Sequence, residues 1–528
     1  MPTLHWIGKD KIINHHQEVP YKVLDHEYTS PLTPKGGISD CGNMIINGDN
    51  LEALKSLLPK YEGKVNCIYI DPPYNTGNES WVYNDNVNSP KIKKWLGKVV
   101  GKESEDLTRH DKWLCMMYPR LKLLHKLLAK DGAIFISINF KYEHYHLRCI
   151  CNEIFGDSNY IGELTWEATT QPINSGSARF GLQQKVEPVI FFAKNKNTQT
   201  GFILKELDSG LKYPHQGKLG KCRFEIIEKS DAGSYERNTM KFSILGHFPR
   251  QGKRWQIGQD TAIELEINNR LEIVDGFVKR AIYPEDEIDK RKFVPFWSHL
   301  NASQFGTAQS GKDLLNVIMG KAIGFDTVKP PELIEELLSH FDKNSIILDS
   351  FAGSGTTAHA VLNLNKQDGG NRKFILIEME DYAETITAER VKRVINGYAD
   401  KEGTGGSFDY YTLGEPLFDE NNNLNENVGI EKIREYVWFI ETRSSYSPPS
   451  ERCPQDGVVF LGHHNHTSYY FIYEKDNLTT LDYESLAEYV QQKAERYIIY
   501  ADNCLLPETF VREKNIEFKK IPRDITRF

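Results

Sequence analysis

Two adjacent prolines, Pro72 and Pro73, directly follow the apolar run Val65–Ile70 and limit how this part of the chain can fold. The run has the length and the β-branched content of a buried parallel strand. Because proline cannot donate a ladder hydrogen bond, the strand must end there. Asp71 and Tyr74 are therefore left at the carboxyl rim of a strand, where open α/β sheets place their chemistry.

Asp71, Pro72, Pro73 and Tyr74 together suit one chemical task, the holding of a planar ring that carries an amino group. The Asp71 carboxylate and the Pro72 carbonyl can accept hydrogen bonds from an exocyclic NH2, and Tyr74 offers an aromatic face for stacking. Bonds accepted from both amino hydrogens draw the nitrogen lone pair out of conjugation and make it a usable nucleophile. The alternative is an ordinary β-turn, because Pro-Pro after a strand is common.

A second motif lies far along the chain, where the apolar residues 345–349 run into the glycine-containing segment 350–357. A strand, a glycine loop and a helix from 358 would place backbone N–H groups where an anion or a polar cofactor can approach. The loop lacks the P-loop lysine and the GxGxxG spacing. The next apolar run ends in Glu378, a position from which a carboxylate can hold ribose hydroxyls. Plain turns at the glycines are the alternative.

At 528 residues the chain is too long for one ordinary domain, and roughly two to four are expected. Its net charge of −8 is unevenly spread: residues 160–330 carry 24 Lys and Arg against 20 Asp and Glu, whereas residues 400–528 carry 14 against 23. The middle can therefore face a phosphate backbone, and the acidic tail another partner. We find no apolar run that could cross a bilayer, no signal-peptide core and no CxxC pair, so we expect a cytoplasmic protein with reduced cysteines.

Several other segments give weaker indications. Residues 1–40 show little periodicity and are expected to form an irregular arm. Asp49 precedes a helix expected from Leu51 and is either its N-cap or part of a site. The histidine run 463–466 has no partner at ligand spacing, so we expect a loop there and no metal site. Residues that can either contact a substrate or simply face solvent are Trp81, Tyr83, Gln171, Asn174, Ser175, Ser177 and the basic-aromatic group Lys253-Arg254-Trp255.

The segments Asp71–Tyr74 and Phe351–Thr356 together resemble the catalytic and cofactor motifs of S-adenosylmethionine-dependent amino-methyltransferases of DNA. The catalytic motif comes first and a long insert separates the two, an order that resembles the β class. Gly48–Glu52 and Lys329-Pro330 are further similar to the Mod subunits of type III restriction–modification systems. One departure is Asn139, where relatives often carry an acid.

The resemblance implies an α/β fold: a Rossmann-like class I methyltransferase sheet, circularly permuted, with an inserted α+β target-recognition domain and a small C-terminal α/β domain. The domains expected from it are an N-terminal arm (1–40), a catalytic half (41–160), a target-recognition domain (161–324), a cofactor-binding half (325–400) and a C-terminal acidic α/β domain (401–528).

The resemblance also implies roles for individual residues. Asp71, Pro72, Pro73 and Tyr74 would be catalytic and would hold a flipped base. Glu378 would bind the ribose of the cofactor, Asp49 would lie near its adenine, and Thr327 and Lys329 near its methionine end. The full set expected to bind S-adenosyl-L-methionine is Asp49, Asp71, Thr327, Lys329, Asp349, Phe351, Ala352, Gly353, Ser354, Gly355, Thr356 and Glu378. No metal is needed, because the sulfonium supplies the leaving group.

The activity implied is transfer of a methyl group to adenine N6 in double-stranded DNA. Asp71, in place of Ser, at the first motif position favours adenine N6 over cytosine N4 in this family. A recognition and scaffold subunit that requires a nuclease-helicase partner is the alternative, and methylation of RNA or protein is a third. The family further implies a homodimer and a Res-type restriction partner.

Overall fold

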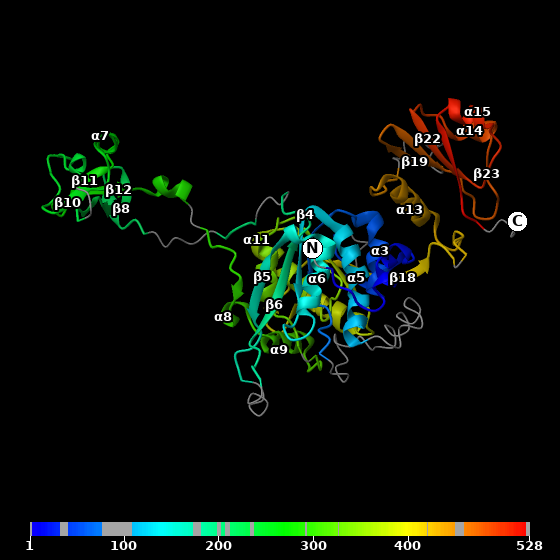
Figure 1. Cartoon of the computed structure of the whole chain (residues 1–528), viewed down its shortest axis with the longest axis horizontal. Helices are drawn as coiled ribbons and strands as arrows, with labels where there is room; N and C mark the ends of the chain where they lie inside the picture. Colours follow the sequence, from blue (N-terminus) through cyan, green and yellow to red (C-terminus); the bar gives the residue numbers. More distant parts are fainter. Residues whose placement is uncertain are drawn as a thin grey trace. The chain divides into compact units, whose positions relative to one another are not determined.

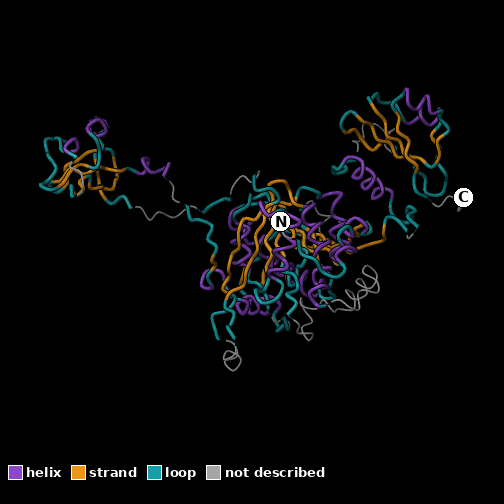
Figure 2. The backbone as a smooth tube through the Cα atoms, viewed as in Figure 1, coloured by secondary structure: helices purple, strands orange, loops and turns teal. Residues whose placement is uncertain are grey.

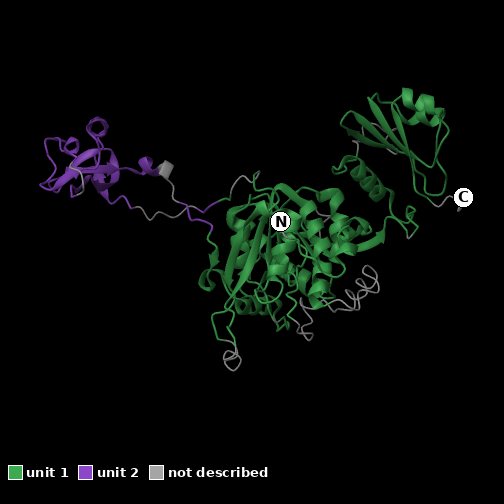
Figure 3. Cartoon of the chain, viewed as in Figure 1, with its two compact units in different colours: residues 1–203, 297–528 green, residues 204–296 purple. Residues whose placement is uncertain are grey.

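The computed structural model describes most of the chain: residues 3–31, 41–76, 108–172, 181–197, 202–205, 212–232, 237–290, 293–325, 327–419, 421–448 and 459–523. Trp81, Tyr83, Asn174, Ser175 and Ser177, which were singled out in the sequence, lie outside the described residues. The chain forms two compact units, one made of Met1–Ile203 with Trp297–Phe528 and one made of Leu204–Phe296 (Figure 3).

The larger unit is built on a ten-stranded mixed sheet (Figure 1). Its first strand pairs antiparallel with the second; the second to seventh strands are mutually parallel; the eighth is antiparallel to both of its neighbours; and the ninth and tenth are parallel. In spatial order the strands are β1 (Lys22–Ser30), β18 (Phe408–Pro416), β2 (Met44–Asn47), β15 (Lys373–Glu378), β14 (Ile346–Asp349), β3 (Val65–Ile70), β4 (Leu128–Ser137), β6 (Val186–Ala193), β5 (Tyr160–Glu167) and β13 (His299–Leu300).

The central pair of this sheet joins the two sequence motifs. β3, which leads into Asp71, lies directly beside β14, which leads into the glycine loop, with Ile347 paired to Cys67 and Leu348 to Ile68. Residues more than two hundred positions apart in the chain are therefore neighbours. Both strands are buried along most of their length, as the apolar runs predict.

Helices pack on the sheet in two groups, seen around the strands in Figure 2. α3, α5 and α6 pack on one another and share a core with Ile68, Ile136 and Ile375, whereas α10, α11 and α12 pack together separately. This gives helices on both faces of a largely parallel sheet. Between the N-terminal and C-terminal segments, the helices of the larger unit are α3 (Asn50–Tyr61), α5 (Arg109–Leu127), α6 (His144–Phe155), α8 (Ala302–Phe305), α9 (Ala308–Met319), α10 (Pro331–Ser339), α11 (Thr356–Asp368) and α12 (Glu389–Asn396). The same part of the chain contains the short helices Asp157–Asn159 and Ala383–Ala388 and the hairpin of β16 (Gly397–Tyr398) and β17 (Lys401–Glu402).

The N-terminal segment is not the irregular arm expected from the sequence. It contains α1 (Lys9–Ile12), α2 (His15–Glu18) and the edge strand β1, which pairs antiparallel with β18. An edge strand has a neighbour on one side only, and the burial of β1 does not alternate regularly. This explains why the sequence of β1 shows no clear period.

The smaller unit, Leu204–Phe296, is narrower than the recognition segment 161–324 expected from the sequence, because β5 and β6 join the main sheet and α9 packs on α12. Its core contains Trp255, which is only 1% exposed and donates a hydrogen bond to the Phe242 carbonyl at 2.7 Å. The expectation that Trp255 contacts a substrate is therefore wrong. The elements of this unit are β7 (His215–Gly217), β8 (Gly220–Ile226), β9 (Glu228–Ser230), β10 (Lys253–Trp255), α7 (Gln259–Ile267), β11 (Leu271–Val274), β12 (Phe277–Ile282) and the short helices Asn238–Met240 and Pro284–Lys290.

The described part of the C-terminal segment contains a separate four-stranded sheet and three helices. His463 bonds to Ser468 at 2.7 Å and Gln492 at 2.5 Å, which accounts for both of its ring nitrogens. None of the helices in the described parts of the chain has the length and apolar character needed to cross a bilayer. The elements are α13 (Ile430–Thr442), β19 (Phe460–His464), β20 (Thr467–Phe471), β21 (Thr480–Leu481), α14 (Tyr483–Tyr489), β22 (Arg496–Ala501), β23 (Asn503–Cys504), α15 (Glu508–Glu513) and β24 (Ile516–Lys520), with sheet order β19-β20-β22-β24.

Candidate functional site

Three acidic side chains stand at the carboxyl ends of three neighbouring parallel strands. Asp71 follows β3, Asp349 ends β14 and Glu378 ends β15. The strands lie in the order β15-β14-β3, so the three acids occupy one edge of the sheet. This is the edge at which open α/β sheets bind ligands.

The catalytic motif is organised around one lysine. Lys329 Nζ lies 2.9 Å from Asp71 Oδ2, donates to the Tyr74 hydroxyl at 2.7 Å and lies 3.3 Å from Glu187 Oε2. The Tyr74 hydroxyl in turn donates to Glu187 Oε2 at 3.1 Å. The other carboxylate oxygen, Asp71 Oδ1, is buried and has no hydrogen-bond partner among the residues that the structure describes. It is therefore the atom of this group that a ligand can use.

The charges of this cluster fix its protonation. Burial alone would lower the pKa of Lys329, but the carboxylates of Asp71 and Glu187 outweigh burial and raise it above the ordinary value. Burial, together with the same two carboxylates, raises the pKa of Tyr74 well above the ordinary phenol value. Lys329 is thus a cation and Tyr74 a neutral phenol near pH 7. Tyr74 can offer its ring and its hydroxyl, but it cannot serve as a base.

The two prolines present their carbonyls differently. The indole Nε1 of Trp113 on α5 donates to the Pro73 carbonyl at 2.6 Å, which anchors the turn to the helix. No hydrogen bond to the Pro72 carbonyl occurs within the described residues. Asp71 Oδ1 and the Pro72 carbonyl are both open acceptors. This agrees with the expectation that they hold an amino group together.

The second motif forms a tight loop from β14 into α11. Gly353 and Gly355 both have positive φ, 52° and 80°. A Cβ added at Gly355 would lie 3.1 Å from the Thr387 carbonyl oxygen, so both conformation and space favour glycine there. Behind the loop, the buried guanidinium of Arg390 donates to the hydroxyls of Ser354 at 2.8 Å and Thr356 at 2.7 Å.

Asp349 and Glu378 are buried, and neither forms an ion pair with a residue that the structure describes. Glu378 accepts hydrogen bonds from the backbone N–H of Gly353 at 2.8 Å and of Met379 at 2.9 Å. Asp349 accepts from the Thr357 hydroxyl at 2.5 Å and from the Phe351 N–H at 3.0 Å. Burial outweighs these bonds and raises the pKa of each carboxyl to about 7.

A narrow pocket of about 30 Å³ connects the two motifs. Asp49, Gly355 and Glu378 border the edge without lining this pocket; Asp49 caps α3 by accepting from the N–H of Leu51 at 2.9 Å. The residues that line it are Tyr69, Asp71, Phe325, Thr327, Val328, Lys329, Asp349, Phe351, Ala352, Gly353, Ser354, Thr356 and Thr357. Nine of the expected cofactor residues are thus brought together, from segments on both sides of the long insert.

Three residues of the site were missed in the sequence. Glu187 contacts both Lys329 and Tyr74, Trp113 holds Pro73, and Arg390 supports the glycine loop. Glu187 could have been noticed, because it is the one acid in the otherwise apolar strand β6. Arg390 gives no such indication, because it lies in a helix rich in charged residues.

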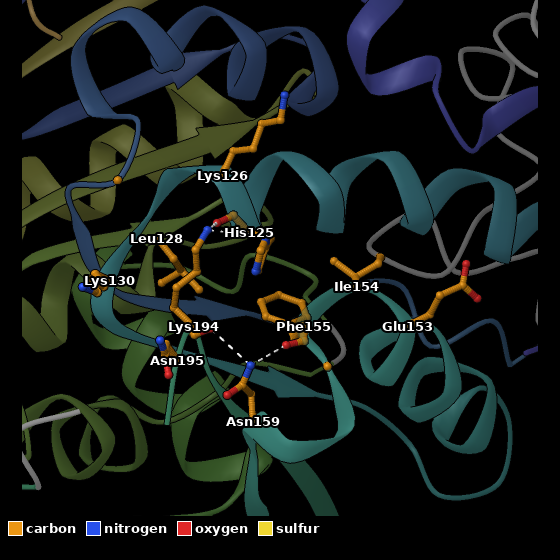
Figure 4. A pocket seen from close by; sticks show the side chains of 12 residues that line it. His125, Lys126, Leu128, Lys130, Glu153, Ile154, Phe155, Asn159, Lys194 and Asn195 are labelled. Atoms are coloured by element: carbon orange, nitrogen blue, oxygen red, sulfur yellow. Dashed lines mark hydrogen bonds between the residues drawn. The ribbon is translucent and has the colours of Figure 1, made fainter. Parts of the chain in front are cut away.

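A larger pocket, of about 620 Å³, lies elsewhere (Figure 4). It is lined by His125, Lys126, Leu128 and Lys194, and Leu128 is the first residue of β4. The pocket therefore lies at the amino end of the strands, at the edge of the sheet opposite Asp71. None of the motif residues lines it, so size alone does not mark the functional site.

Comparison with known proteins adds a family to this geometry. The family model described as DNA methylase, of the N6/N4 type, matches residues 65–389. The EcoPI Mod subunit of Escherichia phage P1 is 30% identical over 72% of this chain and 64% of its own length, and the StyLTI Mod subunit of Salmonella typhimurium is 30% identical over 64% and 52%. The type II methyltransferase M.KpnI of Klebsiella pneumoniae is 27% identical over 65% of this chain and 81% of its own. The chain thus spans between half and two thirds of the two Mod subunits.

Proposed function

Because the chain belongs to the N6/N4 family of DNA methylases, we propose that it methylates the N6 amino group of adenine in double-stranded DNA. The observation that carries this proposal is the unpartnered, buried Asp71 Oδ1 beside the open Pro72 carbonyl. Two unbonded acceptors on adjacent residues suit the two hydrogens of an exocyclic amino group. Cytosine N4 has the same two hydrogens; the resemblance of the motif that begins with Asp71 favours adenine.

The neighbouring side chains support a base in that position. The Tyr74 ring lies next to the acceptors, and its hydroxyl is fixed by Lys329 and Glu187. A ring so fixed can stack on an extruded base at little cost in side-chain entropy. Extrusion is required because the amino group of a paired adenine is buried in the stack, and it costs a few kcal/mol.

S-adenosylmethionine is the cofactor of this family, and when bound it supplies a methyl group on a positively charged sulfur. We assign Asp49, Thr327, Lys329, Asp349 and Glu378, with the loop Phe351–Thr356, to its binding. The buried carboxyls of Asp349 and Glu378 have no ion pair among the described residues, so they suit a cationic ligand. The methyl group would pass from sulfur to the amino nitrogen, and Asp71 would hold the proton that the nitrogen loses.

We assign DNA recognition to the compact unit Leu204–Phe296, which lies within the segment 161–324 expected from the sequence. The order of the motifs, with β3 before β14 in the chain and beside it in the sheet, supports a circularly permuted methyltransferase sheet. A homodimer is part of the same proposal, because one recognition unit can then serve the partner's active site.

The names of the relatives support a second role, as the modification subunit of a restriction–modification system. The phage P1 and Salmonella proteins are Mod subunits, whereas M.KpnI is a type II methyltransferase. If the chain has a Res-type partner, residues 401–528 are our candidate for the contact. Deletion of these residues is then expected to abolish partner binding and to leave methylation intact.

The deciding experiment is transfer of labelled methyl from S-adenosylmethionine to unmethylated genomic DNA, followed by nucleoside analysis. We expect label in N6-methyladenine with the natural protein and a loss of at least about 100-fold with Asp71→Ala, because a positioned acceptor is removed. Cofactor affinity should be retained in that variant. Label in N4-methylcytosine would replace adenine by cytosine, and full activity of Asp71→Ala would refute the mechanism.

A further inference from the structure

A wholly buried carboxylate lies close to the catalytic motif but does not line the pocket between the two motifs. Glu143, at the N-terminal end of α6, is 0% exposed. One of its oxygens lies 2.6 Å from His110 Nδ1 and also accepts a hydrogen bond from the Asn75 side-chain amide; the other lies 2.7 Å from His146 Nδ1. Four residues from three separate segments thus meet at one carboxylate.

Asn75 connects this cluster to the catalytic residues. It directly follows Tyr74, is 2% exposed and has the left-handed backbone conformation, with φ of 57°. Asparagine tolerates this conformation better than most residues when its side chain is bonded. The Asn75 amide also donates to the Arg109 carbonyl at 3.2 Å, so the start of α5 is tied to the same point.

The charge of Glu143 is balanced by imidazoles. An ionised carboxylate without exposure is stable only if it is paired and hydrogen-bonded. His110 and His146 are its nearest basic groups, and the hydrogen bond from Glu143 raises the pKa of His146 above the ordinary value. Their side chains are 38% and 36% exposed, so both rings also reach solvent.

The same three side chains could also be read as a metal site, because their ligand atoms lie within 4.8 Å of one another. The distances favour hydrogen bonds. Each carboxylate oxygen is already 2.6 or 2.7 Å from an imidazole nitrogen, which is a hydrogen-bond separation, and one oxygen carries Asn75 as well. A metal ion would have to displace these bonds.

We propose that Glu143, held by His110 and His146, is a positioning residue that sets the catalytic motif by fixing Asn75. This inference rests on the proposed function, because it concerns the same site. Glu143 does not reach the pocket and so takes no part in the chemistry. Its bond to Asn75 and the bond of Trp113 to Pro73 hold the peptide on both sides of Tyr74. The acceptors and the ring are thereby aimed before a base arrives.

The test compares Glu143→Ala and Glu143→Gln with Glu163→Gln. Glu163, on β5, is the matched control. Its carboxylate pairs with a single imidazole of α6, that of His144, at 2.7 Å, and among the described residues it has no bond to segment 71–76. We expect kcat of Glu143→Ala to fall by about 100-fold, because small misplacements of reacting groups cost that much. Glu143→Gln should lose about 10-fold, since one amide oxygen can still accept from Asn75. Glu163→Gln should retain its activity.

Three further readouts separate positioning from general damage. The affinity for S-adenosylmethionine should change by less than about twofold in both Glu143 variants, because the cofactor pocket is not touched. Amide hydrogen exchange at the residues of segment 71–76 that carry a backbone N–H should accelerate in Glu143→Ala and Glu143→Gln and not in Glu163→Gln. Thermal unfolding shows whether Glu143→Ala folds, and Glu143→Gln carries the test if it does not.

The outcomes are distinguishable. If the natural protein does not methylate DNA, the proposed function fails, and hydrogen exchange alone still decides whether Glu143 fixes the loop. Natural exchange at 71–76 together with natural kcat in both Glu143 variants would overturn the positioning role. Stoichiometric binding of Zn²⁺ by the natural protein, lost in His110→Ala and His146→Ala, would overturn it in favour of a metal site.

Discussion

The two halves of the candidate site treat buried acids in opposite ways. In the catalytic half, Asp71 and Glu187 share the cation Lys329, so each of the two acids has a cationic partner within the protein. In the cofactor half, Asp349 and Glu378 receive only backbone N–H groups and a hydroxyl, and burial raises the pKa of both to about 7. The acids of one half are paired with a cation, whereas Asp349 and Glu378 have no ion pair among the described residues.

This difference matches the charges of the two ligands that we propose. An adenine is neutral, so the half that receives it needs fixed acceptors and no carboxylate left free for a cationic ligand. S-adenosylmethionine carries a positive sulfonium and an ammonium group, so the half that receives it gains by holding carboxyls that lack a cation. The protein thereby separates the two ligands by electrostatics as well as by shape, and each carboxyl can be tested by removing either its cation or its charge.

The largest effect is expected for Lys329→Met, which removes the cation from the catalytic half. The free energy of unfolding should fall by about 3 kcal/mol, because two largely buried carboxylates lose their partner. Methylation should fall as well, since Asp71 and Tyr74 lose their shared donor. Urea unfolding and methyl transfer measure the two effects.

Lys185→Met is the matched control for that experiment. Lys185 pairs with Glu167 at 3.0 Å, but its side chain is 59% exposed, against 10% for Lys329. Exposed pairs contribute little, so less than about 1 kcal/mol should be lost. Adding Glu187→Gln to Lys329→Met should restore part of the stability. If Lys329→Met and Lys185→Met lowered the free energy of unfolding equally, Lys329 would not be the cation that stabilises Asp71 and Glu187.

A second effect is expected from pH in the cofactor half, where the acids are protonated on folding instead of being paired with a cation. Folding raises the pKa of Asp349 and Glu378 to about 7, whereas unfolded carboxyls titrate near about 4. Between these values the folded chain holds protons that the unfolded chain has released. The free energy of unfolding of the cofactor-free protein should therefore receive a contribution that falls as pH rises from about 5 to 7, by about 1.4 kcal/mol per pH unit for each carboxyl.

Asp349→Asn removes one of these two protons and should make that slope less steep. The variant is well suited, because an amide can still accept from the Phe351 N–H and can donate to the Thr357 hydroxyl. Its affinity for S-adenosylmethionine at pH 8 should be about 10-fold lower, since one charge is lost. Urea unfolding at several pH values and calorimetric binding measure both. Slopes equal to those of the natural protein would mean that Asp349 is already ionised at pH 5.

Asp368→Asn is the control with the opposite sign. Although burial opposes it, the bonds from Arg372 lower the pKa of Asp368, so its contribution to stability is present at neutral pH and lost only as acid is added. The slope between pH 5 and 7 should therefore be natural in Asp368→Asn. If Asp368→Asn changed the pH dependence of the free energy of unfolding between pH 5 and 7, that dependence would not arise from Asp349 and Glu378.

The sequence predicted the parts of this comparison that are local. The strands leading into Asp71 and Asp349 follow from apolar runs ended by prolines or glycines, and the carboxyl-edge position of both acids follows from the parallel sheet. Glu187 and Glu143 escaped notice, because the motif residues that they contact lie in distant segments: Lys329 and Tyr74 for Glu187, and Asn75 for Glu143. The one local sign was the position of Glu187 as the single acid of the apolar strand β6. Trp255 was misread for a related reason: a tryptophan beside two basic residues looks exposed in sequence, and only the packing of its unit shows that it is core.

The smallest effect concerns Asp49, which caps a helix in the structure and is also expected from the sequence to contact the cofactor. Its carboxylate caps α3, and the N–H of the preceding Gly48 donates to the Glu378 carbonyl at 2.9 Å, so Asp49 stands beside the acid expected to hold ribose. Asp49→Asn keeps a capping oxygen and removes the charge, which also faces the buried guanidinium of Arg120 at 3.6 Å. The free energy of unfolding should fall by about 1 kcal/mol with the loss of this ion pair, while cofactor affinity falls by about fivefold, as for the loss of a weak charged hydrogen bond. Asp49→Ala should lose about 1 kcal/mol of stability in addition. Natural cofactor affinity in Asp49→Asn would limit Asp49 to the helix cap and to its ion pair with Arg120, and would leave Asp349 and Glu378 as the acids that attract the cofactor.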